Sequence, residues 1–289
     1  MNNLFYTLFL VLLLGGICSA WDEDGRLSEE NQAIINEKRQ TIESEIATLK
    51  DHPWAGRYYF GNGLGKNVTL TLAPENGFTV TWRGCLGLYD QNHGTADWNG
   101  DTLKLSFAFD VAEGYIGNYA NEYMPIRWGE RIYLIRADGI IEFCNAINSR
   151  TEPRTGVYGR FLLRREDEKK EAKGKPQLPE KFMPYLLDKP VDAAIVSIKD
   201  TREGKITEKI ATVVVNKGKK DGLLPGMELN VVRPGSVYGE VRLIKVEETQ
   251  SEGEFRYDFP HERTRFSFLT RKPVPAAGWR LSTVPGWQR

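Results

Sequence analysis

The strongest constraint on the fold is a short alternation of apolar and polar residues that recurs along much of the chain. Val68, Leu70 and Leu72 alternate with threonines, and the same pattern returns after a turn at residues 78–82. Alternate side chains of a strand point to opposite faces, so each segment predicts a strand with one buried face. About seven or eight such segments between residues 54 and 165 predict an antiparallel meander, either a barrel or a strongly curved sheet.

One turn within this region gives a specific local signal. Asp138-Gly139 separates two apolar runs, residues 132–135 and 140–143. An Asp-Gly pair between such runs favours the tight turn of a β-hairpin. We therefore expect both runs to be strands that pair with each other.

A second β region is predicted over residues 191–271. A β-branched run at residues 210–215 is followed by a glycine-rich stretch at residues 216–226 and then by an alternating segment. This order predicts a strand, a compact double turn in which glycines supply positive φ, and a returning strand. The size of the region suits a small SH3-like or related β-barrel, with five strands expected at residues 194–198, 210–215, 227–232, 239–246 and 254–257.

Three other segments flank or join the two β regions. Residues 28–50 predict an amphipathic helix that begins at Ser28 and carries one apolar stripe from Ile35 onward. Such a helix either lies against the following β domain or pairs two subunits as a short coiled coil. Residues 166–190 are charged and then proline-rich, which predicts a linker, and residues 272–289 predict an extended, mobile tail.

The first 20 residues have the pattern of a signal peptide. An apolar run at residues 4–14 is followed by Cys18-Ser-Ala20, which places small residues at the positions that a signal peptidase recognises. Cleavage after Ala20 would leave an exported protein, periplasmic or extracellular, with no transmembrane span. The alternative is an uncleaved anchor, although the run is shorter than the ~20 apolar residues that a bilayer needs.

Two cysteines, Cys85 and Cys144, remain after that cleavage. An even number of cysteines in an exported protein favours a disulfide, and each of the two lies beside a predicted strand. We predict a disulfide between Cys85 and Cys144, with two separate buried thiols as the alternative.

The sequence contains little that indicates catalysis or ion binding. The 39 basic and 39 acidic residues balance, which gives no electrostatic reason to expect a nucleic-acid partner. Phosphate-binding loops, zinc-protease helices and nucleophile elbows are absent, and the histidines are limited to His52, His93 and His261. Residues 90–94 resemble the start of a calcium loop, but a polar turn explains them equally well. We therefore assign no catalytic, cofactor-binding or metal-binding residues.

The first β region loosely resembles the lipocalin-like (calycin) barrels. The resemblance rests on Trp54 near the first strand, the up-and-down strand order and an arginine-rich closing strand at residues 160–165. It implies a barrel with a cavity for a small apolar ligand.

The second β region resembles small barrel domains of bacterial envelope proteins, of the rod-shape-determining and flagellar-assembly type. The resemblance implies a fold and a compartment but no active site. It rests on a turn motif formed by Asn216, Gly218, Asp221, Gly222, Leu223 and Gly226, and on a later turn at residues 237–241.

Together these features favour an exported, non-catalytic protein of the bacterial cell envelope. Its expected partner is an envelope protein or polymer bound through the β domains, and oligomers through the N-terminal helix are a further option. The alternatives are a lipocalin-like carrier of a small apolar ligand and, third, a hydrolase whose site is scattered along the sequence.

Overall fold

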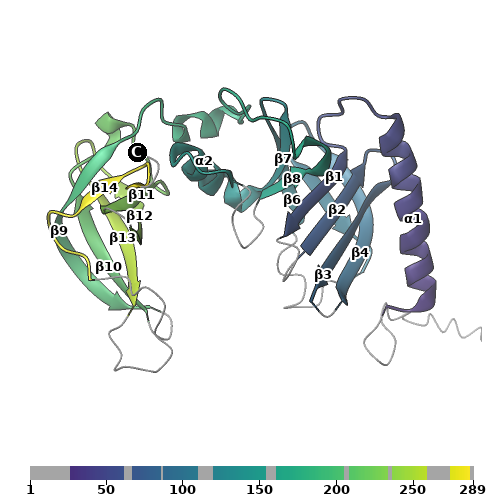
Figure 1. Cartoon of the computed structure of the whole chain (residues 1–289), viewed down its shortest axis with the longest axis horizontal. Helices are drawn as coiled ribbons and strands as arrows, with labels where there is room; N and C mark the ends of the chain where they lie inside the picture. The colour runs from purple at the N-terminus through teal and green to yellow at the C-terminus, as the bar shows by residue number, and fades with distance from the viewer. Residues whose placement is uncertain are drawn as a thin grey trace, which may run out of the picture.

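The computed structural model places a helix and two closed antiparallel barrels along an elongated molecule (Figure 1). The predicted mainly-β fold with an N-terminal helix is confirmed. The predicted signal peptide and His261 lie outside the described residues. Those residues are 27–61, 67–85, 87–109, 120–153, 161–204, 208–233, 236–258 and 274–286.

The N-terminal helix α1 (Glu29–Thr48) lies against the outer face of the first barrel. Ser28 caps it as predicted, because its hydroxyl accepts a hydrogen bond of 3.3 Å from the backbone N–H of Asn31. Ile35 and Ile42 of the apolar stripe are fully buried. At the far end of the helix, the carboxylate of Glu45 accepts hydrogen bonds from the turn between the second and third strands. The protein's own barrel thus covers the stripe that a coiled coil would have used.

The first barrel is an up-and-down meander in which each strand pairs with the next and the last pairs with the first. The closing contact sets Tyr58 opposite Arg164. The strands are β1 (Gly56–Gly61), β2 (Asn67–Ala73), β3 (Gly77–Gly84), β4 (Gly87–Trp98), β5 (Leu103–Phe107), β6 (Glu122–Trp128), β7 (Arg131–Arg136) and β8 (Phe161–Arg164).

Large apolar side chains from seven of the eight strands, all except β4, meet in one core. Tyr58, Leu72, Phe78 and Leu103 are all completely buried there. Each such side chain contributes about 1.5–3 kcal/mol through the surface it removes from water. The alternation in the sequence therefore corresponds to the inner and outer faces of the barrel wall.

The predicted hairpin at Asp138-Gly139 is wrong. Residues 137–139 form a short 3₁₀ turn and lead into helix α2 (Ile140–Asn148), while β7 pairs with β6 and β8. Ile140, Phe143 and Cys144 are buried. They stand at positions i, i+3 and i+4, which lie on one face of a helix. The helical period of this segment outweighed the local turn preference of Asp-Gly.

The second barrel has six strands in the order β10-β13-β12-β11-β14-β9, and pairing of β9 with β10 closes it. Its core is formed by one cluster of aliphatic residues around Phe255. The strands are β9 (Asp192–Glu203), β10 (Glu208–Val215), β11 (Glu228–Arg233), β12 (Ser236–Val246), β13 (Ser251–Asp258) and β14 (Arg280–Ser282).

The sixth strand corrects the prediction of a mobile tail at residues 272–289. β14 fills the gap between β11 and β9, with Leu281 opposite both Val231 and Ala193. Leu281 and Val284 are 1% exposed. The tail is held because a barrel without it would leave two strand edges unpaired, and backbone groups on such edges lose their hydrogen bonds.

The connector between the barrels contains two 3₁₀ segments, η3 (Arg165–Asp167) and η4 (Glu180–Tyr185). Side chains of η4 pack against the cluster around α2, and Tyr185 also packs against the core of the second barrel. Among the described residues, no helix has the length and apolar character needed to cross a membrane.

Candidate functional site

The double turn predicted from the sequence lies at the junction of the two barrels. Its shape depends on Asp221, whose carboxylate accepts hydrogen bonds from the backbone N–H of Gly218 (3.0 Å) and from the ammonium group of Lys217 (2.7 Å). Gly222 follows with φ of +84°, a conformation that other residues adopt only under strain. These turn residues therefore have a structural task, which is to hold a fixed surface toward the connector and α2.

Two asparagines on α2 bind this surface and the connector. Asn145 donates to the carbonyl of Gly226 (3.0 Å) and accepts from the N–H of Glu228 (3.3 Å). One helical turn later, Asn148 donates to the carbonyl of Tyr185 (2.9 Å) and accepts from the N–H of Leu187 (3.0 Å). Each amide thus satisfies two backbone groups, and together they fix the second barrel and the connector to the first domain.

The sequence analysis missed both asparagines. Two asparagines three positions apart lie on the same face of a helix, and this spacing could have indicated a shared binding role. Because the segment was interpreted as a strand, the spacing had no such meaning. Gly226 also allows close approach, since a Cβ atom there would lie 3.2 Å from the side chain of Ile141.

An open groove of about 700 Å³ runs along this junction, between the connector and the double turn. Its lining combines apolar side chains with charges of both signs. The apolar lining comes from Pro184, Leu186, Leu187, Pro190 and Val191, and the polar lining from Asp188, Lys189, Asp192, Lys217, Asp221 and Gly222.

Two carboxylates of this lining each accept a hydrogen bond from a lysine. The hydrogen bond from Lys217 lowers the pKa of Asp221, and the hydrogen bond from Lys175, at 2.5 Å, lowers the pKa of Asp188. Both carboxylates therefore stay ionised well into the acid range. Carboxylates of this kind suit recognition of a charged partner and are poor general acids or bases at neutral pH.

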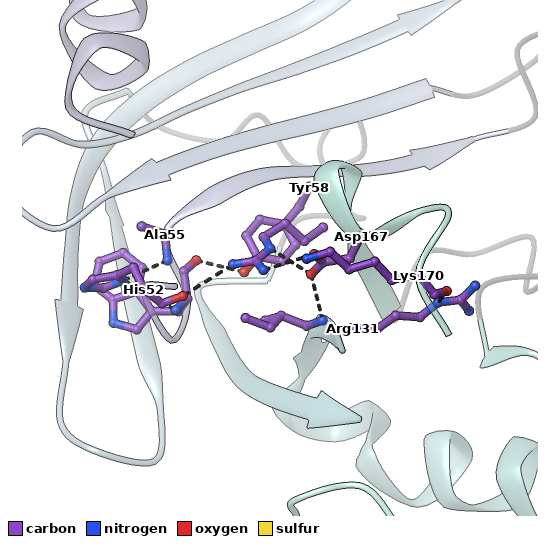
Figure 2. A network of polar contacts seen from close by, with 9 residues as sticks. His52, Ala55, Tyr58, Arg131, Asp167 and Lys170 are labelled. Carbon is purple, nitrogen blue, oxygen red and sulfur yellow. Dashed lines mark hydrogen bonds and ion pairs between the residues drawn. The ribbon is translucent and has the colours of Figure 1, made fainter. Parts of the chain in front are cut away.

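A second polar cluster lies where β8 leads into the connector (Figure 2). Asp167 is completely buried and accepts hydrogen bonds from Arg164 (2.7 and 3.0 Å), Lys170 (2.7 Å) and the N–H of Ile132 (3.0 Å). Burial raises the pKa of Asp167, but the hydrogen bonds from Arg164 and Lys170 outweigh it, so the net pKa is lowered. Both carboxylate oxygens are occupied, which makes Asp167 a structural anchor for the start of the connector.

Neighbouring residues extend this cluster to the first strand. Arg164 also reaches the carbonyl of His52 at 3.4 Å, and the hydroxyl of Tyr58 donates to the carbonyl of Trp54 at 2.8 Å. His52 in turn accepts through Nδ1 from the N–H of Ala55 at 3.0 Å (Figure 2). Burial lowers the pKa of His52, so its imidazole is neutral at pH 7 and serves as an acceptor.

The segment at residues 90–94 is part of strand β4 and forms neither a calcium loop nor a turn. Asn92 accepts from the N–H of His93 and donates to the carbonyl of Phe109. Asp90 is buried beside the barrel core, and its Oδ1 makes no hydrogen bond in the described structure. Burial raises the pKa of Asp90 to about 6.

The predicted disulfide between Cys85 and Cys144 is wrong. Cys144 is buried on α2, whereas Cys85 is exposed in the turn after β3, and no disulfide joins them. Burial raises the pKa of the Cys144 thiol to about 12, so it packs as an apolar group. The sequence pattern placed each cysteine beside a strand, but Cys144 belongs to a helix that faces the connector.

The part of the chain that the structure describes contains no group of three or more His, Cys, Asp or Glu side chains arranged to hold a metal ion. Comparison with protein-family models, with curated proteins and with solved structures found no match for this chain.

Proposed function

We propose that this protein is an exported, non-catalytic component of the bacterial cell envelope, which binds an envelope protein or polymer through its β domains. The groove at the junction of the two barrels supports this proposal most directly. It brings apolar and charged side chains together on one surface, as protein interaction surfaces do. The leader-like first 20 residues and the resemblance of the second β region to envelope domains support the compartment.

The closed barrels limit how a partner is bound. Both barrels are closed, so each described strand has a neighbour on either side along part of its length, and little strand edge is left for a partner to extend. We therefore expect binding to rely mainly on side chains and loops. The groove offers the connector, with Leu187 and Pro190, and the fixed pair of Lys217 and Asp221 on one continuous surface.

The carrier alternative has less support. Its expected feature is an open cavity in the first barrel, whereas the inward side chains of the described strands pack into one core. Tyr58, Phe78 and Leu103 fill the interior, each with no exposed surface. A small apolar ligand would have to displace these contacts, at a cost of about 1.5–3 kcal/mol for each side chain.

Site-specific photocrosslinking in the intact envelope tests the proposed binding. A photoreactive residue at Lys189, exposed on the groove rim, is expected to give a discrete adduct whose mass spectrum identifies a protein or polymer. The same residue at Lys104, exposed on β5 of the first barrel, serves as the control and is expected to give none. Equal adducts at both positions, or none at Lys189, would contradict the proposal.

Export is tested separately by sequencing the N-terminus of the protein recovered from the envelope or the medium. Cleavage after Ala20 predicts a chain that begins at Trp21. Recovery of the protein with its full leader in a cytoplasmic fraction would contradict export to the envelope. The crosslinking experiment would then test only whether the groove binds a partner.

A further inference from the structure

A second pocket lies on the outer face of the first barrel, between α1 and strands β1 to β3. It has a volume of about 270 Å³, and every residue that lines it carries a hydroxyl, guanidinium or carboxylate group. Four threonines form its floor, three arginines surround it, and Glu43 is the acidic residue among the lining side chains.

The strand register arranges the four threonines as a square. Thr69 pairs with Thr81 and Thr71 pairs with Thr79, so all four side chains leave the same face of β2 and β3. Thr71 and Thr79 are nearly buried, at 5% and 2% exposure. Threonine hydroxyls that line such a floor can donate hydrogen bonds to the oxygens of a ligand.

The three arginines come from separate parts of the chain. Arg39 belongs to α1, where Asn36 holds it through a hydrogen bond of 3.2 Å. Arg57 belongs to β1, beside Thr71 in the register. Arg165 follows β8 and places its guanidinium 5.9 Å from the centre of the Tyr59 ring.

Arg57 has unused hydrogen-bonding capacity. Its Nε is buried and makes no hydrogen bond within the described structure. The nearest carboxylate oxygen, from Glu43, is 3.8 Å away, which is beyond hydrogen-bond distance. Three guanidinium groups against one carboxylate leave the pocket with an excess of two positive charges.

We propose that this pocket binds a tetrahedral oxyanion of the phosphate type, either free or as the terminal phosphoryl group of a larger molecule. Guanidinium groups match phosphate oxygens through paired, charge-assisted hydrogen bonds, and threonine hydroxyls donate to the oxygens that remain. This inference is independent of the groove at the barrel junction. The ordinary alternative is that threonines are simply favoured in strands and that the arginines are solvated, in which case no anion binds.

Calorimetry and NMR of the full chain with inorganic phosphate test the site. We expect saturable binding, with amide shifts concentrated at Thr69, Thr71, Thr79 and Thr81. Arg57→Gln is expected to weaken binding at least tenfold, because charge-assisted hydrogen bonds to one guanidinium are lost. Glu43→Gln is expected to tighten binding, because it removes the one nearby negative charge.

Two further variants control for general effects of charge and of folding. Arg83→Gln removes the same charge from β3, where the exposed side chain is not part of the pocket lining, and is expected to weaken binding much less than Arg57→Gln because no direct hydrogen bond to the ligand is lost. Thr79→Val keeps the side-chain shape but loses the hydroxyl, and is expected to weaken binding about threefold to tenfold. Amide spectra that match the wild type elsewhere would show that each variant folds.

A second experiment distinguishes a soluble phosphate from a lipid headgroup. It measures binding to phosphatidylcholine vesicles that contain phosphatidic acid. Binding of inorganic phosphate indicates a free ion or soluble ester, and binding of these vesicles alone indicates a lipid headgroup. Absence of both, or binding that Arg57→Gln and Arg83→Gln weaken equally, would overturn the proposal.

Discussion

Asp90 is the residue at which pH acts most directly on the stability of the first barrel. It lies on β4 opposite Trp82, and its side chain is 3% exposed. The next inward residue, Asn92, satisfies its amide through Phe109 and His93, whereas Oδ1 of Asp90 makes no hydrogen bond in the described structure. The ionised form of Asp90 therefore loses hydration at Oδ1 without a compensating hydrogen bond there.

The size of the effect follows from the pKa. Burial raises the pKa of Asp90 from 3.8 to about 6, despite a hydrogen bond from the N–H of Gln91 that lowers it. A shift of about two units corresponds to about 3 kcal/mol between the two protonation states. Because the folded state binds the proton more tightly, this group costs no stability below about pH 4, and the cost grows as pH rises to about 6.

Asp90→Asn replaces the carboxyl group with a neutral group of nearly the same shape. We expect the variant to be more stable than the wild type by about 3 kcal/mol at pH 8 and equally stable at pH 4. Amide hydrogen exchange in β3 and β4 measures this on the full chain, because it reports the opening free energy of the first barrel separately from the second.

Asp97→Asn is the matched control, since Asp97 lies on the same strand with an exposed side chain. A gain for Asp90→Asn that persists unchanged at pH 4 would mean that the effect comes from packing and not from ionisation. A variant that is no more stable than the wild type at pH 8 would refute the reasoning altogether.

The remaining predictions concern the polar anchor, a close contact between strands and the cysteines. Asp167→Asn is expected to destabilise the protein by about 3–5 kcal/mol, because Arg164 loses its buried counter-charge. The lowered pKa of Asp167 also predicts that wild-type thermal stability falls as pH decreases below about 4, which unfolding scans between pH 2 and 7 would show or contradict. Gly77→Ala is expected to cost about 2 kcal/mol more than Gly100→Ala in urea unfolding, because both glycines have positive φ but a Cβ at Gly77 would lie 2.1 Å from the carbonyl oxygen of Gly94. In the chain cleaved after Ala20, which lacks Cys18, iodoacetamide without reductant is expected to add one group to the native protein at the exposed Cys85 and a second at Cys144 after denaturation. A denatured chain that takes up no group would mean that the two cysteines form a disulfide.

The structure shows where sequence reasoning about this protein succeeds. The alternation at residues 68–72 and 78–82 appears directly as the inner and outer faces of β2 and β3. The cap at Ser28 and the apolar stripe from Ile35 predicted the two ends of helix α1 to within a few residues of those observed. These features depend on neighbours within a few positions, which the sequence displays.

The errors all involve partners that are distant in the chain. Asp138-Gly139 has the local preference of a hairpin turn, but β7 finds its second neighbour in β8, more than 20 residues later, and the intervening segment becomes α2. Leu281 lies in a proline-rich tail without any clear strand pattern. It forms β14 because β11 and β9 have no other described neighbour at that place.

The same division applies to the two candidate sites. The sequence marked the turn at residues 216–226, but it did not show that Asn145 and Asn148 would bind that turn and the connector. It likewise showed alternating threonines, but not that Arg39 and Arg165 would lie beside them.

By itself the sequence determined which residues face inward in segments with a clear period, such as residues 68–72 and 78–82, since the period of a strand or helix is set by local backbone geometry. Only the tertiary structure decided which surfaces those segments cover. Closing a barrel brings together residues that are far apart in the chain, and a local sequence pattern does not show which of them will meet.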